Sequence, residues 1–435
     1  MNTSDFNRRF FSFLDSSPTP YHAVKNMSEI FESVGIQKIV EKDDISFGIG
    51  QPSFFIREDG SLVAFNVGNE KEKGFRILGS HSDSPCLKIK AKPDIAENTY
   101  HKLGIEVYGG ALLNPWFDRE LSIAGRVTFS NDENKAFSTL INFASPVGII
   151  PSLAIHFDRQ ANNEKKINPQ KDIIPIVGLN IDEDGCLSNI LLKYLQNNKP
   201  HLSPQALLDY DLFLYDCNPA RYSGFNEEFI GSSRLDNLLS SFAAAVSIAN
   251  SNKKTNFIFI CNNHEEIGST SASGAQGNLL QSLFERMYPN PQERYKLLAQ
   301  SFLISIDNAH ATHPNFPETH DKCHTINLNH GPVLKINANH RYASTGISGG
   351  IFKILANEVG VKVQEFVMKN DMACGSTIGP ITAAKLGVNT VDVGSASLAM
   401  HSIREITGSK DPYLLYKVLQ HFINRATIPE IQSCE

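Results

Sequence analysis

Short apolar runs bounded by turn residues recur along the chain and predict buried strands. They lie at 75–85, 211–216, 257–260, 302–307, 361–367 and 390–395. Helical patterns lie between them: residues 237–251 place Leu238, Phe242 and Val246 on one face, and similar periodicity occurs at 6–35 (broken by SSPTP), 351–360, 377–387 and 412–426. The strand candidates are short, continuous apolar runs, whereas the helix candidates place their apolar residues on one face of a helix. Strands alternating with helices indicate an α/β fold, a mixed sheet flanked by helices on both faces.

Residues 88–225 have a different pattern. They are richer in turns and in short extended segments, at 105–114, 121–129 and 139–151. Strands that follow one another without intervening helices favour a separate, strand-rich domain. We therefore expect an α/β domain formed by residues 1–87 and 226–435, interrupted by an inserted domain of residues 88–225.

Composition and charge restrict the classes of protein to which this chain can belong. A chain of 435 residues, 41% hydrophobic and 20% charged, fits a globular protein of about two domains. The net charge of −6 without a basic block argues against a nucleic-acid partner, and no run of 18 apolar residues predicts a membrane span. The N-terminus lacks the apolar core of a signal peptide. Seven scattered cysteines are typical of reduced thiols, so we expect a cytoplasmic protein.

Potential metal ligands fall where the predicted strands end. In open α/β sheets, ligands bind beyond the carboxyl ends of the strands. Nitrogen and carboxylate ligands suit zinc, and also cobalt or manganese. Asp83, two residues after a candidate histidine, can support the site as an outer partner. The candidate ligands are His81, Asp236, Glu266, Asp307 and His401.

The number of ligands favours two metal ions. If Asp236 bridges both ions, each ion has three protein ligands: His81 pairs with Asp307 or with Glu266 on one ion, and His401 completes the other. Two ions about 3.5–4 Å apart can clamp a hydrolytic water and its target carbonyl. Glu265 then remains to take a proton from that water and pass it to the leaving amine.

Each feature also has a simpler interpretation. Adjacent glutamates are usually solvated surface, and Asp236 could be only the N-cap of the helix at 237–251. The histidines between 308 and 340 could form a polar surface loop, or a rim that recognises an anion with Lys335. A serine or cysteine hydrolase is disfavoured because no G-x-S-x-G motif surrounds the serines or Cys374.

Several motifs together resemble those of the aspartyl aminopeptidases, a family of two-metal metallopeptidases. They extend over almost the whole chain in the family's order. The matching stretches are 79-GSHSDSPCLKIK-90, 108-YGGALLNPWFDRELSIAGRV-127, 233-SRLDN-237, 264-HEEIGS-269, 307-DNAHATHPN-315, 335-KINANHRYA-343, 372-MACGSTIGP-380 and 394-GSASLAMHSIRE-405.

The resemblance implies a role for each matching residue. His81 and His401 correspond to terminal metal ligands, Asp236 to the bridging carboxylate and Glu265 to the general base. The other positions divide between metal and substrate. Glu266 and Asp307 correspond to further ligands of two divalent ions, most often zinc, Asp83 to the residue that orients His81, and the candidate substrate contacts are Lys335, His310, Tyr342 and, more weakly, His324.

The resemblance also implies an activity and an assembly. The family removes N-terminal Asp or Glu from peptides, and Lys335 would face the acidic side chain. The inserted region resembles a dimerisation domain, in which His156 would reach a neighbouring subunit's site within a homo-oligomer, a dodecamer built from dimers. Two alternatives remain: a related two-metal aminopeptidase with broad or different specificity, and a non-catalytic scaffold of the same fold.

Overall fold

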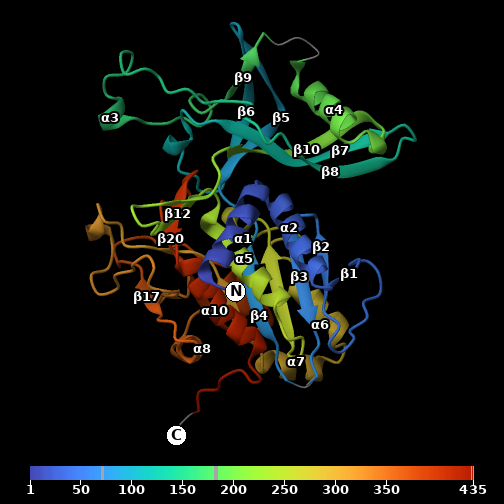
Figure 1. Ribbon diagram of the computed structural model, residues 1–435, viewed down its shortest axis with the longest axis vertical. Coiled ribbons are helices and arrows are strands. Elements are labelled where there is room, and N and C mark those ends of the chain that lie inside the picture. Colours follow the sequence, from blue (N-terminus) through green and yellow to red (C-terminus); the bar gives the residue numbers. More distant parts are fainter. Residues whose placement is uncertain (70–72, 181–184, 433, 435) are drawn as a thin grey trace. The chain divides into compact units, whose positions relative to one another are not determined.

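Two compact units make up the chain. The computed structural model describes residues 1–69, 73–180, 185–432 and 434 (Figure 1). The first unit comprises Met1–Ser84, Ala220–Met400 and Glu405–Glu435, and the second comprises Pro85–Pro219 and His401–Arg404.

A nine-stranded mixed sheet forms the centre of the first unit. Four neighbouring strands, β13, β4, β14 and β18, are parallel, whereas β3 and β16 pair with β13 and β18 in the antiparallel sense. The order across the sheet is β1 (Gln37–Lys38), β2 (Ser53–Arg57), β3 (Ser61–Asn66), β13 (Phe257–Asn262), β4 (Arg76–His81), β14 (Phe302–Ile306), β18 (Asn389–Gly394), β16 (Val333–Ile336) and β17 (Gln364–Val367).

Helices cover both faces of this sheet, as Figure 1 shows. One apolar core joins the sheet to α1 (Thr3–Ser16), α2 (Pro20–Ser33), α5 (Leu235–Ala249), α8 (Gly346–Glu358) and α10 (Asp411–Asn424). A second core joins the other face to α6 (Leu279–Met287), α7 (Pro291–Ala299) and α9 (Ile378–Leu386). The predicted fold class is confirmed.

Strand β13 shows why its sequence is apolar throughout. Side chains alternate between the two faces of a strand. Phe257 and Phe259 lie in the first core, whereas Ile258 and Ile260 lie in the second. Because both faces are covered, both sets of positions must be apolar.

Two further sheets complete the structure. A five-stranded sheet in the first unit has the order β11 (Arg221–Ser223), β12 (Phe229–Ser232), β20 (Glu405–Gly408), β19 (Ala396–Leu398) and β15 (Ala309–His310). The second unit contains an antiparallel sheet of β8 (Ala136–Asn142), β7 (Leu121–Asn131), β10 (Pro204–Asp216), β5 (Cys86–Glu97), β6 (Tyr100–Tyr108) and β9 (Ile176–Leu179), with α4 (Leu187–Asn198) and the short α3 (Ala161–Glu164).

Some elements differ from the sequence-based prediction. The run at 211–216 is the end of β10 in the second unit, not a strand of the nine-stranded sheet. Of the region 139–151, only residues 139–142 are strand, as the end of β8. Of the run at 361–367, only residues 364–367 are strand, as β17. The prediction lacked β2, β3, β16, α4, α6 and α7. Across the described part of the chain, no helix has both the length and the apolar character needed to cross a membrane.

Candidate metal centre

Three neighbouring parallel strands carry the candidate ligands to one edge of the sheet. His81 is the last residue of β4 and pairs in register with Asn262, the last residue of β13. The turn that contains Glu265 and Glu266 follows β13, and Asp307 directly follows β14. The carboxyl ends of these strands therefore hold the polar side chains together, as expected for an α/β sheet.

His81 lies at the centre of the cluster. Its Nε2 is 3.6 Å from Asp236 Oδ1 and 3.5 Å from Asp307 Oδ1. Ligand atoms of His81, Asp236 and Glu266 lie within 4.8 Å of one another, and so do those of His81, Glu265 and Asp307. The structure brings together five of the residues singled out in the sequence.

The donor set fits a divalent cation. With metal–ligand bonds of about 2.1 Å, two ligand atoms of a tetrahedral ion lie about 3.4 Å apart. The distances from His81 Nε2 to the two aspartates are close to this value. The other ring nitrogen, Nδ1, lies 3.1 Å from the carbonyl oxygen of Asp83 and can donate to it. That hydrogen bond leaves the Nε2 lone pair facing the carboxylates, the tautomer that a metal-binding histidine needs.

Asp83 connects the histidine to the glutamate pair. Its Oδ1 accepts the backbone N–H of Glu265 at 3.1 Å, and its Oδ2 accepts that of Glu266 at 3.2 Å. The two glutamates form a single 3₁₀ turn, Glu265–Ile267, which begins after His264 at a φ of 63°. One buried carboxylate thus fixes the backbone of both glutamates.

Two residues outside the predicted set hold the backbone of Asp236. Glu405 Oε2 accepts its N–H at 2.9 Å, and Ser84 Oγ donates to its carbonyl oxygen at 2.6 Å. Asp236 has φ −84° and ψ 105°, which are not helical values, and no side-chain capping bond begins α5. Because such extended values are also those of an N-cap residue, the N-cap interpretation of Asp236 stays a prediction. Glu405 lies within the quoted motif ending at 405, but its partner could not be inferred from sequence.

Burial changes the acid–base properties of the site. Burial by itself would lower the pKa of His81, but hydrogen bonds to Asp307 and Asp83 outweigh it and raise that pKa well above its usual value. Burial raises the pKa of Glu265 to about 7. It also raises the pKa of Glu266 well above the usual range, with a further contribution from the neighbouring carboxylates. These directions reflect crowded, desolvated negative charge, which a divalent cation would relieve.

Lys335 gives the cluster a buried cation. Only 2% of this residue is exposed, and its Nζ lies 3.3 Å from Asp307 Oδ2 and 3.2 Å from the carbonyl oxygen of Asn308. Burial opposes ionisation of Asp307, but the charge of Lys335 outweighs it and holds the pKa of Asp307 well below its usual range. Lys335 therefore contacts a candidate ligand directly, which the sequence pattern did not indicate.

The candidate substrate contacts converge beside Lys335. Its Nζ lies 5.1 Å from the centre of the Tyr342 ring, within the range of a cation–π contact. Tyr342 and His310 both pack against Phe366, with ring centres 6.3 and 6.0 Å away. Tyr342 and His310 thus share one aromatic neighbour, and Lys335 lies against the Tyr342 ring.

Three further predicted histidines are described by their local surroundings alone. His324 is hydrogen-bonded to Asp321 at 2.7 Å. His401 belongs to the second unit, where its Nδ1 lies 3.2 Å from the carbonyl oxygen of Gly110. His156 also belongs to the second unit and is exposed. The roles of these three histidines stay predictions.

Gly394→Ala is expected to distort the Asp307 side of the cluster. A Cβ at this position would lie 1.9 Å from the carbonyl oxygen of Asp307. Backbone atoms must move to make room, so we expect the free energy of unfolding to fall by about 3 kcal/mol in urea. Gly346→Ala is the control, because its Cβ would meet nothing within 4 Å. Equal stability of the two variants would contradict this account.

Comparison with known proteins identifies the family of this chain. Residues 13–423 match the family model described as aminopeptidase I zinc metalloprotease (M18). A probable M18 family aminopeptidase 2 from Pseudomonas savastanoi pv. phaseolicola is 43% identical over 428 residues, which cover 98% of this chain and 100% of the relative.

Solved structures give the same result. The cryo-EM structure of the Ape4 and Nbr1 complex contains a chain that is 34% identical, with a TM-score of 0.92 and coverage of 97% of this chain and 86% of that one. The S. cerevisiae mApe1 dodecamer is 30% identical, with a TM-score of 0.84 and 97% coverage of both chains. This protein therefore belongs to the M18 family of zinc metalloproteases and is an aminopeptidase of that family.

Proposed function

We propose that this aminopeptidase removes N-terminal aspartate and glutamate from peptides with two divalent metal ions, which we take to be zinc. The observation that carries the proposal is the position of His81 Nε2, 3.5–3.6 Å from carboxylate oxygens of Asp236 and Asp307 in a buried cluster. Family membership supports the metal and the peptidase activity.

The residues of the site would have separate roles in metal binding and proton transfer. His81, Asp236, Glu266, Asp307 and His401 would hold the ions. The bound ions would polarise the scissile carbonyl and favour ionisation of the attacking water. A carboxylate oxygen of Glu265 would accept the water's proton and then deliver it to the nitrogen of the leaving amine. Asp83 would keep the imidazole of His81 in its ligand tautomer.

Lys335 would supply the preference for acidic residues. Its ammonium is buried beside the Tyr342 ring and would offer a cation to the short carboxylate of an acidic substrate residue. A neutral substrate side chain would not form the charge-assisted hydrogen bond that a substrate carboxylate would form with this ammonium, and the loss of such a bond discriminates between substrates.

A homo-oligomer would complete the site. His156 lies in a segment of the second unit whose neighbours Leu153, Ile155 and Phe157 are exposed apolar residues, Phe157 at 81%. Exposed apolar residues grouped in this way favour a protein contact. We propose that this unit mediates dimerisation, that His156 reaches the site of a neighbouring subunit, and that dimers form a dodecamer. The S. cerevisiae mApe1 structure is a dodecamer, which supports an assembly of that size. The seven free thiols suit the cytoplasm.

A substrate panel tests the activity and its specificity. Initial rates would be measured on Asp-, Glu-, Lys-, Leu- and Ala-p-nitroanilide, with metal-free protein and after addition of zinc, cobalt or manganese. We expect metal-dependent turnover of the Asp and Glu substrates only. Turnover of Leu or Lys substrates would favour the broad-specificity alternative, and metal binding without turnover would favour a non-catalytic scaffold.

Lys335→Met isolates the specificity role. This variant keeps the apolar stem and removes the charge, so both substrate classes should slow, because Asp307 loses its cation. The ratio of kcat/KM for Asp over Ala substrates should fall about tenfold further, since a charge-assisted hydrogen bond contributes about 1.5–3 kcal/mol. Lys353→Met, at an exposed position on α8, is the control. An unchanged ratio would mean that Lys335 acts only on Asp307.

A further inference from the structure

Asp392 is a buried carboxylate that has no role in the proposed reaction. It lies on β18, between β14, whose end leads into Asp307, and β16, which carries Lys335. Its neighbours Val391 and Val393 point into the first core, so the Asp392 side chain lies on the other face of the sheet. A buried carboxylate destabilises a fold unless its contacts compensate it, so those contacts indicate what it does.

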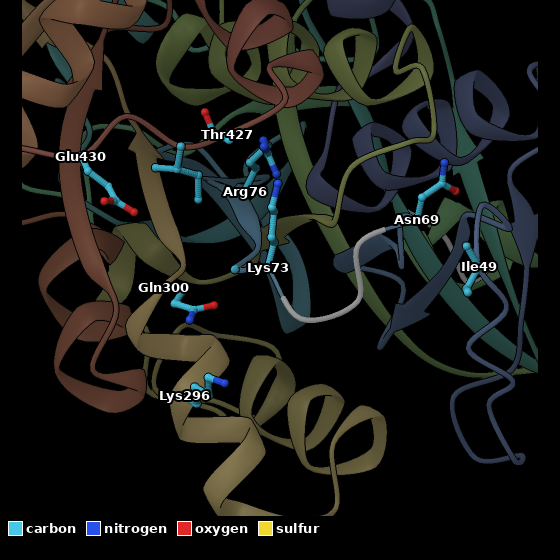
Figure 2. A pocket seen from close by; sticks show the side chains of 10 residues that line it. Ile49, Asn69, Lys73, Arg76, Lys296, Gln300, Thr427 and Glu430 are labelled. Carbon is cyan, nitrogen blue, oxygen red and sulfur yellow. The ribbon is translucent and has the colours of Figure 1, made fainter.

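Protein atoms enclose this carboxylate, since the exposure of Asp392 is 0%. A Cβ on Gly379 would collide with its Oδ2, so the first turn of α9 packs directly against it. The cavity at the amino end of β4 is a different place: Lys73 and Arg76 line it, and Asp392 is not among the lining residues that the structure describes (Figure 2). Asp392 therefore acts through its protein neighbours.

The two oxygens of Asp392 hold two separate segments of the chain. Oδ2 accepts the backbone N–H of Ala343 at 2.5 Å, and Oδ1 accepts the hydroxyl of Thr377 at 2.8 Å. The backbone N–H of Asp392 also donates to Ser344 Oγ at 2.9 Å. Ala343 and Ser344 directly follow Tyr342, whereas Thr377 is the N-cap of α9. One side chain thus joins the backbone beside Tyr342 to the start of a helix.

Further contacts join the same two segments around Tyr342. Ser376 Oγ donates to the carbonyl oxygen of Arg341 at 3.2 Å. Burial raises the pKa of the Tyr342 hydroxyl, and a hydrogen bond with the Cys374 side chain raises it further. The Tyr342 ring is also the one whose centre lies 5.1 Å from Lys335 Nζ. The position of this ring beside the ammonium therefore depends on how the two segments are held.

Asp392 also influences Lys335 by charge. Burial raises the pKa of the Asp392 carboxyl, and the positive charge of Lys335 opposes that rise. The same ammonium lies 3.3 Å from Asp307 Oδ2. Asp392 can thus affect the candidate substrate contacts in two ways, through the backbone beside Tyr342 and through the charge near Lys335. The two ways can be separated by substitution.

We propose that Asp392 is a positioning residue for the acidic side chain of the substrate. Through the backbone of Ala343 it would hold the Tyr342 ring against Lys335, so that the ring and the ammonium form one preorganised site for a carboxylate. Such a site loses less entropy when its ligand binds. This inference rests on the proposed preference for N-terminal Asp and Glu, which it extends to a residue behind the substrate contacts.

Asp392→Ala tests this role in the metal-loaded protein. The ratio of kcat/KM for Asp- over Ala-p-nitroanilide should fall by about tenfold or more, because misplacement of a contact by about 1 Å can cost on the order of 10²-fold. The loss should appear mainly as a higher KM for the Asp substrate, with the metal content per subunit unchanged. A change in stability alone would not alter the ratio between two substrates.

Asp411→Ala is the matched control. Asp411 is also 0% exposed, and its carboxylate accepts two backbone N–H groups, those of Asn329 at 2.6 Å and Gly331 at 3.0 Å. Neither of these residues is a proposed substrate contact. We expect both alanine variants to have a lower Tm, because each leaves buried N–H groups without an acceptor. Only Asp392→Ala should change the substrate ratio.

Asp392→Asn separates position from charge, and it decides the question if Asp392→Ala does not fold. The asparagine oxygen can accept the Ala343 N–H while its NH₂ group donates to Thr377 Oγ. Both connections are kept and the charge is lost, so we expect a substrate ratio within about threefold of the wild type. A tenfold loss in Asp392→Asn would assign the effect to charge and would overturn the positioning role.

Two further results bear on the proposal. If the wild type prefers Asp over Ala and a folded Asp392→Ala keeps that preference, or loses it no more than Asp411→Ala does, the positioning role is overturned and the proposed specificity stands. If the wild type has no such preference, the proposed specificity fails. The crystal structure of Asp392→Ala then still shows whether the Tyr342 ring leaves its place 5.1 Å from Lys335 Nζ, and an unmoved ring would overturn the positioning role.

Discussion

Glu265→Gln is expected to abolish most turnover while the protein keeps its metal. Glutamine has nearly the same shape and preserves the backbone N–H that donates to Asp83, but its amide cannot accept a proton. Removal of a general base lowers kcat by about 10²–10⁴-fold. The measurement is kcat on Asp-p-nitroanilide, together with the metal content per subunit after gel filtration.

Glu266→Gln is the matched comparison for this prediction. The two glutamates are adjacent in one turn, and both backbone N–H groups donate to the same carboxylate of Asp83. If Glu266 is a ligand and Glu265 is the base, Glu266→Gln should lower the metal content, whereas Glu265→Gln should not. Near-normal kcat in Glu265→Gln would refute the base assignment. Metal loss in that variant would instead make Glu265 a ligand.

The different roles proposed for Glu265 and Glu266 explain why two adjacent carboxylates follow the end of strand β13. Burial raises the pKa of both glutamates, and each lies close to other acidic side chains. Adjacent like charges in a desolvated site destabilise the fold unless a cation compensates them. A site built for cations tolerates the pair, and an apolar β13 places it beside His81.

Much of the fold follows from local pattern. The continuous apolar run of β13 and the helical period of α5 are visible in the sequence, since each reflects the faces that the element buries. Strand β16 is not visible, because Lys335 interrupts its apolar run. Helix α4 carries a signal that could have been read: Leu187, Leu191 and Leu195 recur every four residues and are buried.

The ligand types could also be predicted, because metal chemistry restricts them to a few residues at strand ends. The residues that contact these ligands and fix their positions could not be predicted. Glu405 reaches the backbone of Asp236 from 169 positions away in the chain. Lys335 reaches Asp307 although β18 lies between β16 and β14 in the sheet. Such contacts depend on the packing of distant segments, which leaves no mark on local periodicity.

Asp83→Asn is expected to weaken metal binding and turnover together. Asp83 accepts two backbone N–H groups, those of Glu265 and Glu266, with its two oxygens, and its Oδ1 lies 3.5 Å from His81 Nδ1. An asparagine has one carbonyl oxygen and one NH₂ group, so the NH₂ must face one of these donors. Loss of such a supporting partner typically lowers metal affinity about 10–100-fold. Metal affinity would be measured by competition with a chelator, and kcat at saturating metal.

The outcome at saturating metal separates two roles of Asp83. If the Asp83 carboxylate only supports His81, through the approach of its Oδ1 to His81 Nδ1 at 3.5 Å, excess metal should restore kcat. We expect incomplete recovery, because the turn that carries Glu265 also loses an anchor and the base is no longer held in place. Asp44→Asn, which removes the same charge at an exposed position, should leave both quantities unchanged. Full recovery of kcat would show that Asp83 supports the metal alone, and an unchanged metal affinity would show that its contacts with His81 and the glutamate turn have no part in binding.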